Sequence, residues 1–357
     1  MTLPTTQKAV LVPSQGAPAQ VHDDVPLPEP SATQLLVKII YAAINPVDVF
    51  TTQFGLLVES WPFVPGSEAS GIVVKAGANA MSPLGGHFKE GDLVSGCVRL
   101  GVAGHGTFAE YCLLDAEVAV PKPQGLSLAS AATVTVGVLT AFLGIFGELG
   151  IGIEGIEEGK GAGNGRWVAV FGGAGAVGKF AVQTLKLAGY KVVTTSSTKS
   201  FESVRLIGAD AVVDYKLPAD EIVEQITQIT DGKVDLAFDA VSVNNNLVAK
   251  MFTAIPPSSA ERVFTTTNDW DPVPDASLGF VTKGITLGPI GRPESAVLNK
   301  KLTTWIPVIY RLLDNGKLKP GDYSVEGQGV EGIPHAWEAQ KSGRLGSKKV
   351  IVKVADE

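Results

Sequence analysis

The stretch from Val168 to Ser197, VAVFGGAGAVGKFAVQTLKLAGYKVVTTSS, constrains the fold of this chain more than any other. An apolar run leads into a glycine-rich turn, then into a segment with apolar residues at helical spacing, then into a second apolar run. Gly173, Gly175 and Gly178 fit the pattern GxGxxG, which is weak alone because the chain has 41 glycines. The flanking runs strengthen it, and the stretch predicts a strand, a tight turn, a helix and a neighbouring parallel strand.

The rest of the chain predicts an α/β protein of two domains. Short apolar runs broken by Gly and Pro predict a compact β-rich domain before residue 130. Alternating strands and helices over 130–291 predict a doubly wound parallel sheet, with a final strand at ITLGPI and a glycine-rich surface loop at 150–166. A helix and a closing strand, KKVIVKV, follow. We expect that strand to return to the first domain, which then comprises 1–129 and 292–357.

Composition excludes several classes of function. The net charge is −7 with no basic block, which gives no electrostatic support to a nucleic-acid partner. No apolar run reaches the roughly 18 residues of a membrane span. The first residues do not resemble a signal peptide. Cys97 and Cys112 form neither a disulfide framework nor a CxxC site. We therefore expect a cytoplasmic protein.

The glycine turn predicts a binding site for a dinucleotide. Glycines let the backbone approach a pyrophosphate, and the following helix offers free N–H groups and a partial positive charge. An ordinary strand-to-helix turn remains the alternative.

The end of the second strand predicts which dinucleotide is bound. An acidic side chain there would accept from the ribose 2′-hydroxyl of NAD and repel a 2′-phosphate. This chain instead has Ser197, Thr198, Lys199 and Ser200, and Tyr215 ends the next predicted strand. Hydroxyls and an ammonium suit a phosphate, so we expect NADPH. A polar loop with one solvated lysine remains the alternative.

The sequence resembles the medium-chain dehydrogenase/reductase superfamily over nearly its whole length. The resemblance rests on AAINPVDVF, VPGSEASGIV, GDLVSG, GTFAEYCLL, GLSLASAATVTVGVLTAFLGIF, VFGGAGAVG, GADAVVDY and GKLKP. It implies a GroES-like β domain joined to a Rossmann nucleotide-binding domain. Within the superfamily, the runs GYKVVTTSSTKSF and TLGP are most similar to fungal trans-acting enoyl reductases of polyketide pathways, of the lovastatin type.

The resemblance also indicates that no zinc is bound. In zinc-containing members a cysteine stands where this chain has Asn45, and a His–Glu pair stands where it has Ser67 and Glu68. A catalytic zinc needs three protein ligands. The four-cysteine structural lobe cannot form from two cysteines. We expect His22, His87, His105 and His335 to be isolated loop or surface residues.

Further cofactor contacts are implied by the resemblance, position by position. The segment beside the nicotinamide corresponds to Val47, Asp48, Val49 and Phe50. The diphosphate turn corresponds to Gly173, Ala174, Gly175, Ala176 and Val177, and the 2′-phosphate site to Ser197, Thr198, Lys199, Ser200 and Tyr215. The ribose or nicotinamide wall corresponds to Thr266 and Thr267, and a segment near the nicotinamide carboxamide to Leu287 and Gly288. Another cofactor contact corresponds to Gly343 and Arg344. Asn45 and Thr140 are the implied catalytic residues. Thr133 and Thr135 are further hydroxyl donors, and Asn45 is alternatively a turn residue.

These residues predict an NADPH-dependent reductase that adds hydride to the β carbon of an α,β-unsaturated carbonyl. A zinc-free site lacks a Lewis acid, and an enone needs only donors at its oxygen. The substrate is a free small molecule or a carrier-tethered enoyl group, and the protein is a monomer or a homodimer. Phe50 and Leu56 replace a lysine and a tyrosine found in relatives, which leaves the proton donor open. A quinone oxidoreductase and a non-catalytic NADPH- or carrier-binding protein remain alternatives.

Overall fold

The computed structural model describes residues 3–256, 261–268, 270–272 and 278–357. The chain divides into two compact units, and each is described by itself. The first unit comprises Met1–Val136 and Gly288–Glu357, and the second comprises Gly137–Leu287. Sequence analysis predicts the two divisions at 129/130 and 291/292. The division at 136/137 falls within one helix, α3 (Thr135–Phe142).

The second unit is the doubly wound parallel sheet that the sequence predicts. Its strand order is β10-β9-β8-β11-β12-β13, and every described pairing within it is parallel. The strands are β8 (Trp167–Phe171), β9 (Lys191–Ser196), β10 (Ala211–Asp214), β11 (Val234–Asp239), β12 (Val263–Thr266) and β13 (Val281–Gly284). The helices that follow them are α4 (Ala176–Leu187), α5 (Phe201–Leu206), α6 (Ala219–Thr230) and α7 (Asn245–Ala254).

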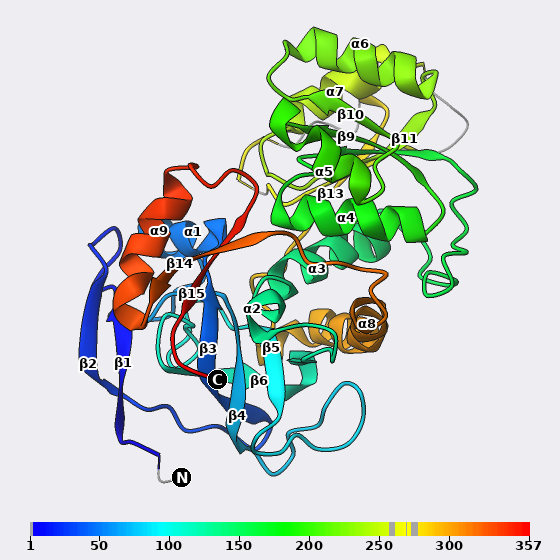
Figure 1. The fold of residues 1–357 in the computed structure, drawn as a ribbon. Coiled ribbons are helices and arrows are strands. Elements are labelled where there is room, and N and C mark those ends of the chain that lie inside the picture. Colours follow the sequence, from blue (N-terminus) through cyan, green and yellow to red (C-terminus); the bar gives the residue numbers. More distant parts are fainter. Residues whose placement is uncertain (1–2, 257–260, 269, 273–277) are drawn as a thin grey trace. The chain divides into compact units, whose positions relative to one another are not determined.

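Alternating side chains of the central strands divide this unit's core between two faces. Ala169 and Phe171 of β8 lie in one cluster with apolar residues of α6 and α7. Val168 and Val170 alternate with them and are equally buried, so they point to the opposite face. Figure 1 shows α6 and α7 on one side of this sheet and α4 on the other. Because both faces are covered, the strands read as continuous apolar runs in the sequence.

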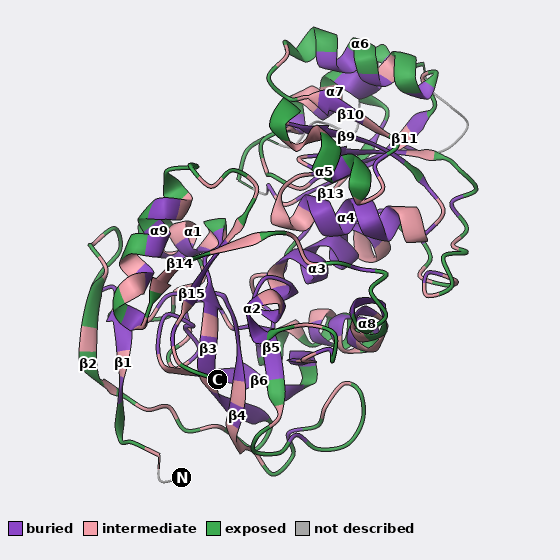
Figure 2. Ribbon diagram, viewed as in Figure 1, coloured by how far each residue is buried: buried purple, intermediate pink, exposed green. Residues whose placement is uncertain are grey.

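The first unit is β-rich. A seven-stranded sheet has the order β14-β15-β3-β4-β5-β7, with β6 paired to β3, and β1 and β2 form a separate pair. The strands are β1 (Thr6–Leu11), β2 (Gln20–Pro26), β3 (Gln34–Ala43), β4 (Glu68–Ala76), β5 (Leu93–Cys97), β6 (Tyr111–Asp115), β7 (Val120–Pro121), β14 (Tyr323–Gln328) and β15 (Lys349–Lys353). The helices are α1 (Pro46–Phe54), α2 (Leu128–Ala131), α8 (Ala296–Asp314) and α9 (Ile333–Lys341). Figure 2 shows the buried residues concentrated on the central strands.

The closing strand returns to the first unit, as the sequence predicts. β15 pairs antiparallel with β3 and parallel with β14.

The prediction of a strand at ITLGPI is wrong, because the edge strand β13 ends at Gly284. Ile285 makes one more backbone bond, to Thr266, and the chain then turns. Pro289 has no N–H to donate to a sheet. The predicted loop at 150–166 is confirmed as a series of turns, anchored by buried Ile151 and Ile156.

Candidate nucleotide-binding and polar sites

The glycine turn after β8 leaves no room for side chains at two of its positions. Gly172 has a φ of +86°, which favours glycine. A Cβ on Gly173 would stand 2.2 Å from Oγ1 of Thr194, and one on Gly178 would stand 2.1 Å from the carbonyl oxygen of Gly172. The sequence pattern therefore reflects a close approach of β8, β9 and α4.

Two buried hydroxyls of β9 hold this turn. The Gly172 N–H donates to Oγ1 of Thr195 at 3.0 Å, and the Gly173 N–H donates to the Thr195 carbonyl at 3.0 Å. Oγ1 of Thr194 donates to the carbonyl of Val170 at 2.6 Å. The hydroxyls of Thr194 and Thr195, inside the strand, are therefore explained by these backbone contacts and need no cofactor.

The N-terminus of α4 has the form of an anion cradle. Gly175 is the N-cap residue and has no side chain with which to cap the first-turn amides. A Cβ on Gly175 would meet only Gly172 O at 3.4 Å and Val241 at 3.9 Å, so there is open space beside it. Ala174, Ala176 and Val177 complete the turn and the first helical residues. These backbone groups fit a diphosphate.

The end of β9 gathers the residues predicted to bind a 2′-phosphate. The Tyr215 N–H donates to the carbonyl of Ser196 at 3.2 Å, because β10 runs parallel to β9 in this register. Oγ of Ser197 lies 3.3 Å from Oγ of Ser200. Lys199 is exposed, as is Thr198, and Tyr215 is 55% exposed. Hydroxyls, an ammonium and a phenol thus face solvent at one edge of the sheet.

The loop after β11 was missed by the sequence analysis. The carboxylate of Asp239 accepts from the backbone N–H groups of Val241 and Asn244 and from Nδ2 of Asn244. Ser242 has a φ of +63°, and its hydroxyl bonds that of Thr267. The loop therefore contacts two predicted parts of the site: Ser242 bonds Thr267, and Val241 lies against Gly172 of the glycine turn. The signal was an acid at a strand end followed by Ser and Asn residues.

A charged cluster in the first unit surrounds Asn45. Nδ2 of Asn45 donates to Oγ of Ser67 at 3.1 Å and to Oε2 of Glu68 at 3.2 Å. Oδ1 of Asn45 accepts from Nζ of Lys349, which also lies 3.0 Å from Oε2 of Glu68. The side chain of Glu68 is fully buried and that of Lys349 is 9% exposed. Sequence analysis singled out Asn45 and Glu68 but missed Lys349.

Asp48 faces the interior beside this cluster. Its Oδ2 accepts from the N–H of Asn45 at 2.7 Å and so braces the start of α1. Burial raises the pKa of Asp48 to about 7, against the opposing effects of the Asn45 N–H, Ser67 and Lys349; the charge of Glu68 adds to the rise. Cys97 pairs with Glu68 across β4 and β5, and burial together with both carboxylates raises its pKa. Val47, Val49 and Phe50 are half-buried on the same helix.

The remaining predicted residues lie in several places. Thr140 is 6% exposed on α3, whose Gly137 lies against Ala176 and Phe180 of α4. Thr266 is buried and accepts from the Asn268 N–H. The predicted pair Leu287 and Gly288 stands where one unit ends and the other resumes. Gly343 has a φ of +65°, and Arg344 forms an ion pair with Glu326.

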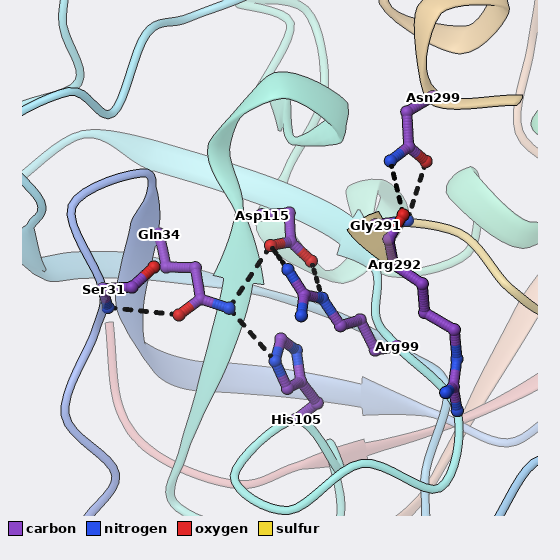
Figure 3. A network of polar contacts seen from close by, with 8 residues as sticks. All are labelled: Ser31, Gln34, Arg99, His105, Asp115, Gly291, Arg292 and Asn299. Atoms are coloured by element: carbon purple, nitrogen blue, oxygen red, sulfur yellow. Dashed lines mark hydrogen bonds and ion pairs between the residues drawn. The ribbon is translucent and has the colours of Figure 1, made fainter. Parts of the chain in front are cut away.

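A second polar network supports the first unit (Figure 3). Arg99 donates twice to Asp115, at 2.6 and 2.7 Å, and Nε2 of Gln34 lies 3.3 Å from Asp115 and 3.2 Å from Nε2 of His105. His105 lies in a loop, as predicted, but it is not a surface residue, because the loop folds inward and leaves its side chain 2% exposed. Burial lowers its pKa to about 4.

We next consider whether side chains in the described part of the chain could bind a metal ion. Within the described ranges, no three side chains of His, Cys, Asp or Glu come together as a metal site. Around Asn45, the groups are its own amide, the Ser67 hydroxyl and two carboxylates. The Asp48 carboxylate accepts from the Asn45 N–H, and the Glu68 carboxylate is already paired with the Lys349 ammonium. In the described part of the chain, no helix is both long and apolar enough to cross a membrane.

Comparisons with known proteins agree with this architecture. The alcohol dehydrogenase GroES-like domain family matches residues 31–124, and the zinc-binding dehydrogenase family matches residues 176–257. Trans-enoyl reductase tazE of Aspergillus terreus is 33% identical over 214 residues, 58% of this chain and 68% of that protein. Dehydrogenase pigH of Monascus ruber is 28% identical over 381 residues, 97% of this chain and 99% of that protein.

Among solved structures, the CurK enoyl reductase has a TM-score of 0.78 at 19% identity, covering 97% of this chain and 99% of that one, which establishes the fold alone. The chain belongs to the medium-chain dehydrogenase/reductase superfamily, with a GroES-like domain and a Rossmann domain. It is an oxidoreductase of the class that uses a nicotinamide cofactor.

Proposed function

We propose that this protein is an NADPH-dependent, zinc-independent reductase of the C=C bond of α,β-unsaturated carbonyl compounds. The observation that carries the proposal is the polar end of β9, where Ser197, Lys199 and Ser200 follow the strand and residues 197–201 include no acid. Tyr215 directly follows β10, and its N–H bonds the last residue of β9. The choice of reaction is supported by similarity to a trans-enoyl reductase over 58% of the chain.

The second unit supplies the groups that would hold NADPH. Backbone N–H groups at the start of α4 suit the diphosphate, and the hydroxyls and ammonium after β9 suit the 2′-phosphate. Thr266 ends β12 and Thr267 follows it, at the same edge of the sheet. The remaining residues implied by family resemblance, Val47–Phe50, Leu287, Gly288, Gly343 and Arg344, belong to the proposed cofactor contacts.

Bound NADPH supplies the hydride, and the protein orients the acceptor and stabilises the charge on its oxygen. Thr140 is the proposed hydroxyl beside the substrate. Thr133 and Thr135 have their hydroxyl hydrogens engaged within the protein, with Ser130 O and Glu68. The proton for the α carbon is proposed to come from solvent. An enone suits a site with hydroxyl donors and no Lewis acid, because the negative charge that hydride addition creates spreads into an enolate.

The test is NADPH oxidation, with NADH in parallel, against a short enone, a 2-enoyl thioester, a quinone and a simple aldehyde. We expect turnover of the enone or the thioester, a preference for NADPH, and no effect of a chelator. Turnover of the quinone alone would replace the proposal with a quinone oxidoreductase. No turnover of any acceptor, with NADPH still bound, would indicate a binding protein.

A further inference from the structure

We propose that Glu68 and Lys349 are positioning residues that together fix the Asn45 amide and the first turns of α1 and α3. The inference deepens the proposed function and rests on it, because the residues aligned with the nicotinamide and substrate, Val47–Phe50 and Thr140, are carried by these two helices. It assigns a role to a buried ion pair that the proposed chemistry does not use.

Glu68 is the centre of the cluster. Its Oε1 accepts from the hydroxyl of Thr135 at 3.0 Å and from the N–H of Val136 at 2.8 Å, both in the first turn of α3. Its Oε2 accepts from Asn45 and pairs with Lys349. A carboxylate at a helix N-terminus is favourable because the first amides carry partial positive charge. One buried side chain thus joins β4, α1, α3 and β15.

Lys349 determines which way the Asn45 amide points. Its ammonium lies against Oδ1, so Nδ2 faces Ser67 and Glu68. The flipped amide would set Oδ1 against the Glu68 carboxylate and Nδ2 against the ammonium, and both contacts would be repulsive. Both Nδ2 hydrogens are therefore committed within the protein. This geometry makes Asn45 a link between the pair and α1, rather than a donor to substrate.

The pair also supplies its own charge balance. The positive charge beside Glu68 comes from a side chain of the closing strand. Removing either partner leaves the other charge uncompensated at a buried or nearly buried position, whereas removing both leaves none. This difference separates a structural role from a positioning role.

The first test compares Lys349→Met, Glu68→Gln and the double variant in the full-length protein, with Lys348→Met as the control. Lys348 is the neighbouring lysine and is exposed. We expect each single variant to lose thermal stability and to lower kcat by about tenfold to a hundredfold, because small displacements of reacting groups are costly. KM for NADPH should change much less. Lys348→Met should match the wild type.

The double variant decides between the two roles. We expect it to regain stability because no unpaired charge remains. We expect kcat to stay low because no ammonium orients the Asn45 amide and no carboxylate stands at the start of α3. Recovery of kcat together with stability would overturn the proposal and leave only a structural ion pair. Unchanged kcat in both single variants would overturn it as well.

The second test does not need activity. With ¹⁵N-labelled asparagine, the side-chain amide of Asn45 is assigned by its absence in Asn45→Ser. We expect slow hydrogen exchange in the wild type and in Lys348→Met, and fast exchange in Lys349→Met. Fast exchange in the wild type would overturn the positioning of Asn45. A wild-type protein without turnover would refute the proposed reductase, and this exchange result would then decide the inference alone.

Discussion

Neighbouring hydroxyl residues on β9 serve different purposes according to burial. Thr194 and Thr195 are buried and fix the glycine turn. Ser197 and Ser200 come after the strand, where Lys199 is exposed and no acid is present. The hydroxyls before Ser196 therefore bond buried backbone groups. In the proposed function, the hydroxyls after Ser196 bind a phosphate.

Replacing Lys199 with Glu should reverse the proposed cofactor preference. The change removes a charge-assisted contact and places a carboxylate beside the 2′-phosphate. We expect the Kd for NADPH to rise about tenfold or more while that for NADH changes little. Fluorescence titration of both nucleotides measures this. Lys160→Glu, an exposed lysine in the 150–166 loop, is the matched control. An equal loss for both nucleotides would contradict a 2′-phosphate site.

His105 should make the first unit sensitive to acid. Its folded pKa of about 4 lies below the usual 6.5, chiefly through burial, with Arg99 and Arg292 lowering it further and Asp115 raising it. Between these values the unfolded chain binds a proton and the native protein does not. Stability is therefore fully present above pH 6.5 and falls as the pH drops toward 4, by about 3 kcal/mol in all.

The variant His105→Gln removes this titration and keeps a polar side chain near Gln34. We expect its free energy of unfolding to decline less steeply than that of the wild type between pH 6.5 and 4, as measured by urea unfolding at several pH values. Parallel slopes in the two proteins would show that His105 is already protonated in the folded state.

At the level of elements, the sequence predicts most strands of both units, because buried parallel strands are continuous apolar runs and the glycine turn marks a strand end. The sequence does not predict strands whose position depends on pairing with a distant part of the chain. The strand after β12 forms at Val281–Gly284, of which Val281 and Gly284 are exposed, and not at the more apolar ITLGPI. β2 is mostly exposed and polar, so its pairing with β1 leaves no hydrophobic pattern to read.

Two glycines of one turn should respond differently to alanine. Gly178→Ala forces a methyl group against the backbone of Gly172, so we expect a loss of about 1–3 kcal/mol in stability. Gly175 has a φ of −72° and open space, so Gly175→Ala should cost less, about 0.5–1 kcal/mol, because alanine is a poorer N-cap residue than glycine. Its cofactor affinity should nevertheless fall, because the methyl group lies beside the first-turn amides.

Thermal unfolding and NADPH titration of both variants provide the measurement. If Gly175→Ala binds NADPH as well as the wild type does, the proposed approach of the diphosphate to this turn is wrong. If Gly178→Ala is as stable as the wild type, α4 does not pack against the turn closely enough to exclude a methyl group.

At the scale of the whole molecule, the sequence predicts most of the candidate site residues but not which of them come into contact. Lys349 and Asn45 are 304 residues apart, and only the pairing of β15 with β3 brings them together. The inward position of His105 likewise depends on Gln34, which begins β3 and is 71 residues earlier in the chain. Residue type and spacing carry no signal for such contacts, which the sheet topology decides.

The first unit should reject zinc. Of the two carboxylates beside Asn45, Glu68 is already paired with Lys349 and Asp48 accepts from the Asn45 N–H, and zinc favours sulfur and nitrogen ligands. After incubation with zinc and desalting, we expect a substoichiometric metal content by mass spectrometry and an unchanged thermal transition. One zinc per chain, released by a chelator with loss of activity, would show that the zinc-free assignment is wrong.

The position of β15 has a consequence for synthesis on the ribosome. Residues 349–353 fill the place between β14 and β3, so the β-rich sheet has a gap until the end of the sequence has been made. Residues 137–287 form a unit with its own core and require nothing from that strand. During translation the Rossmann unit can therefore fold first, while the Tyr41–Ala43 end of β3, beyond its pairing with β6, has no partner on the side that β15 later fills. Until then this strand end is open to pairing with another chain.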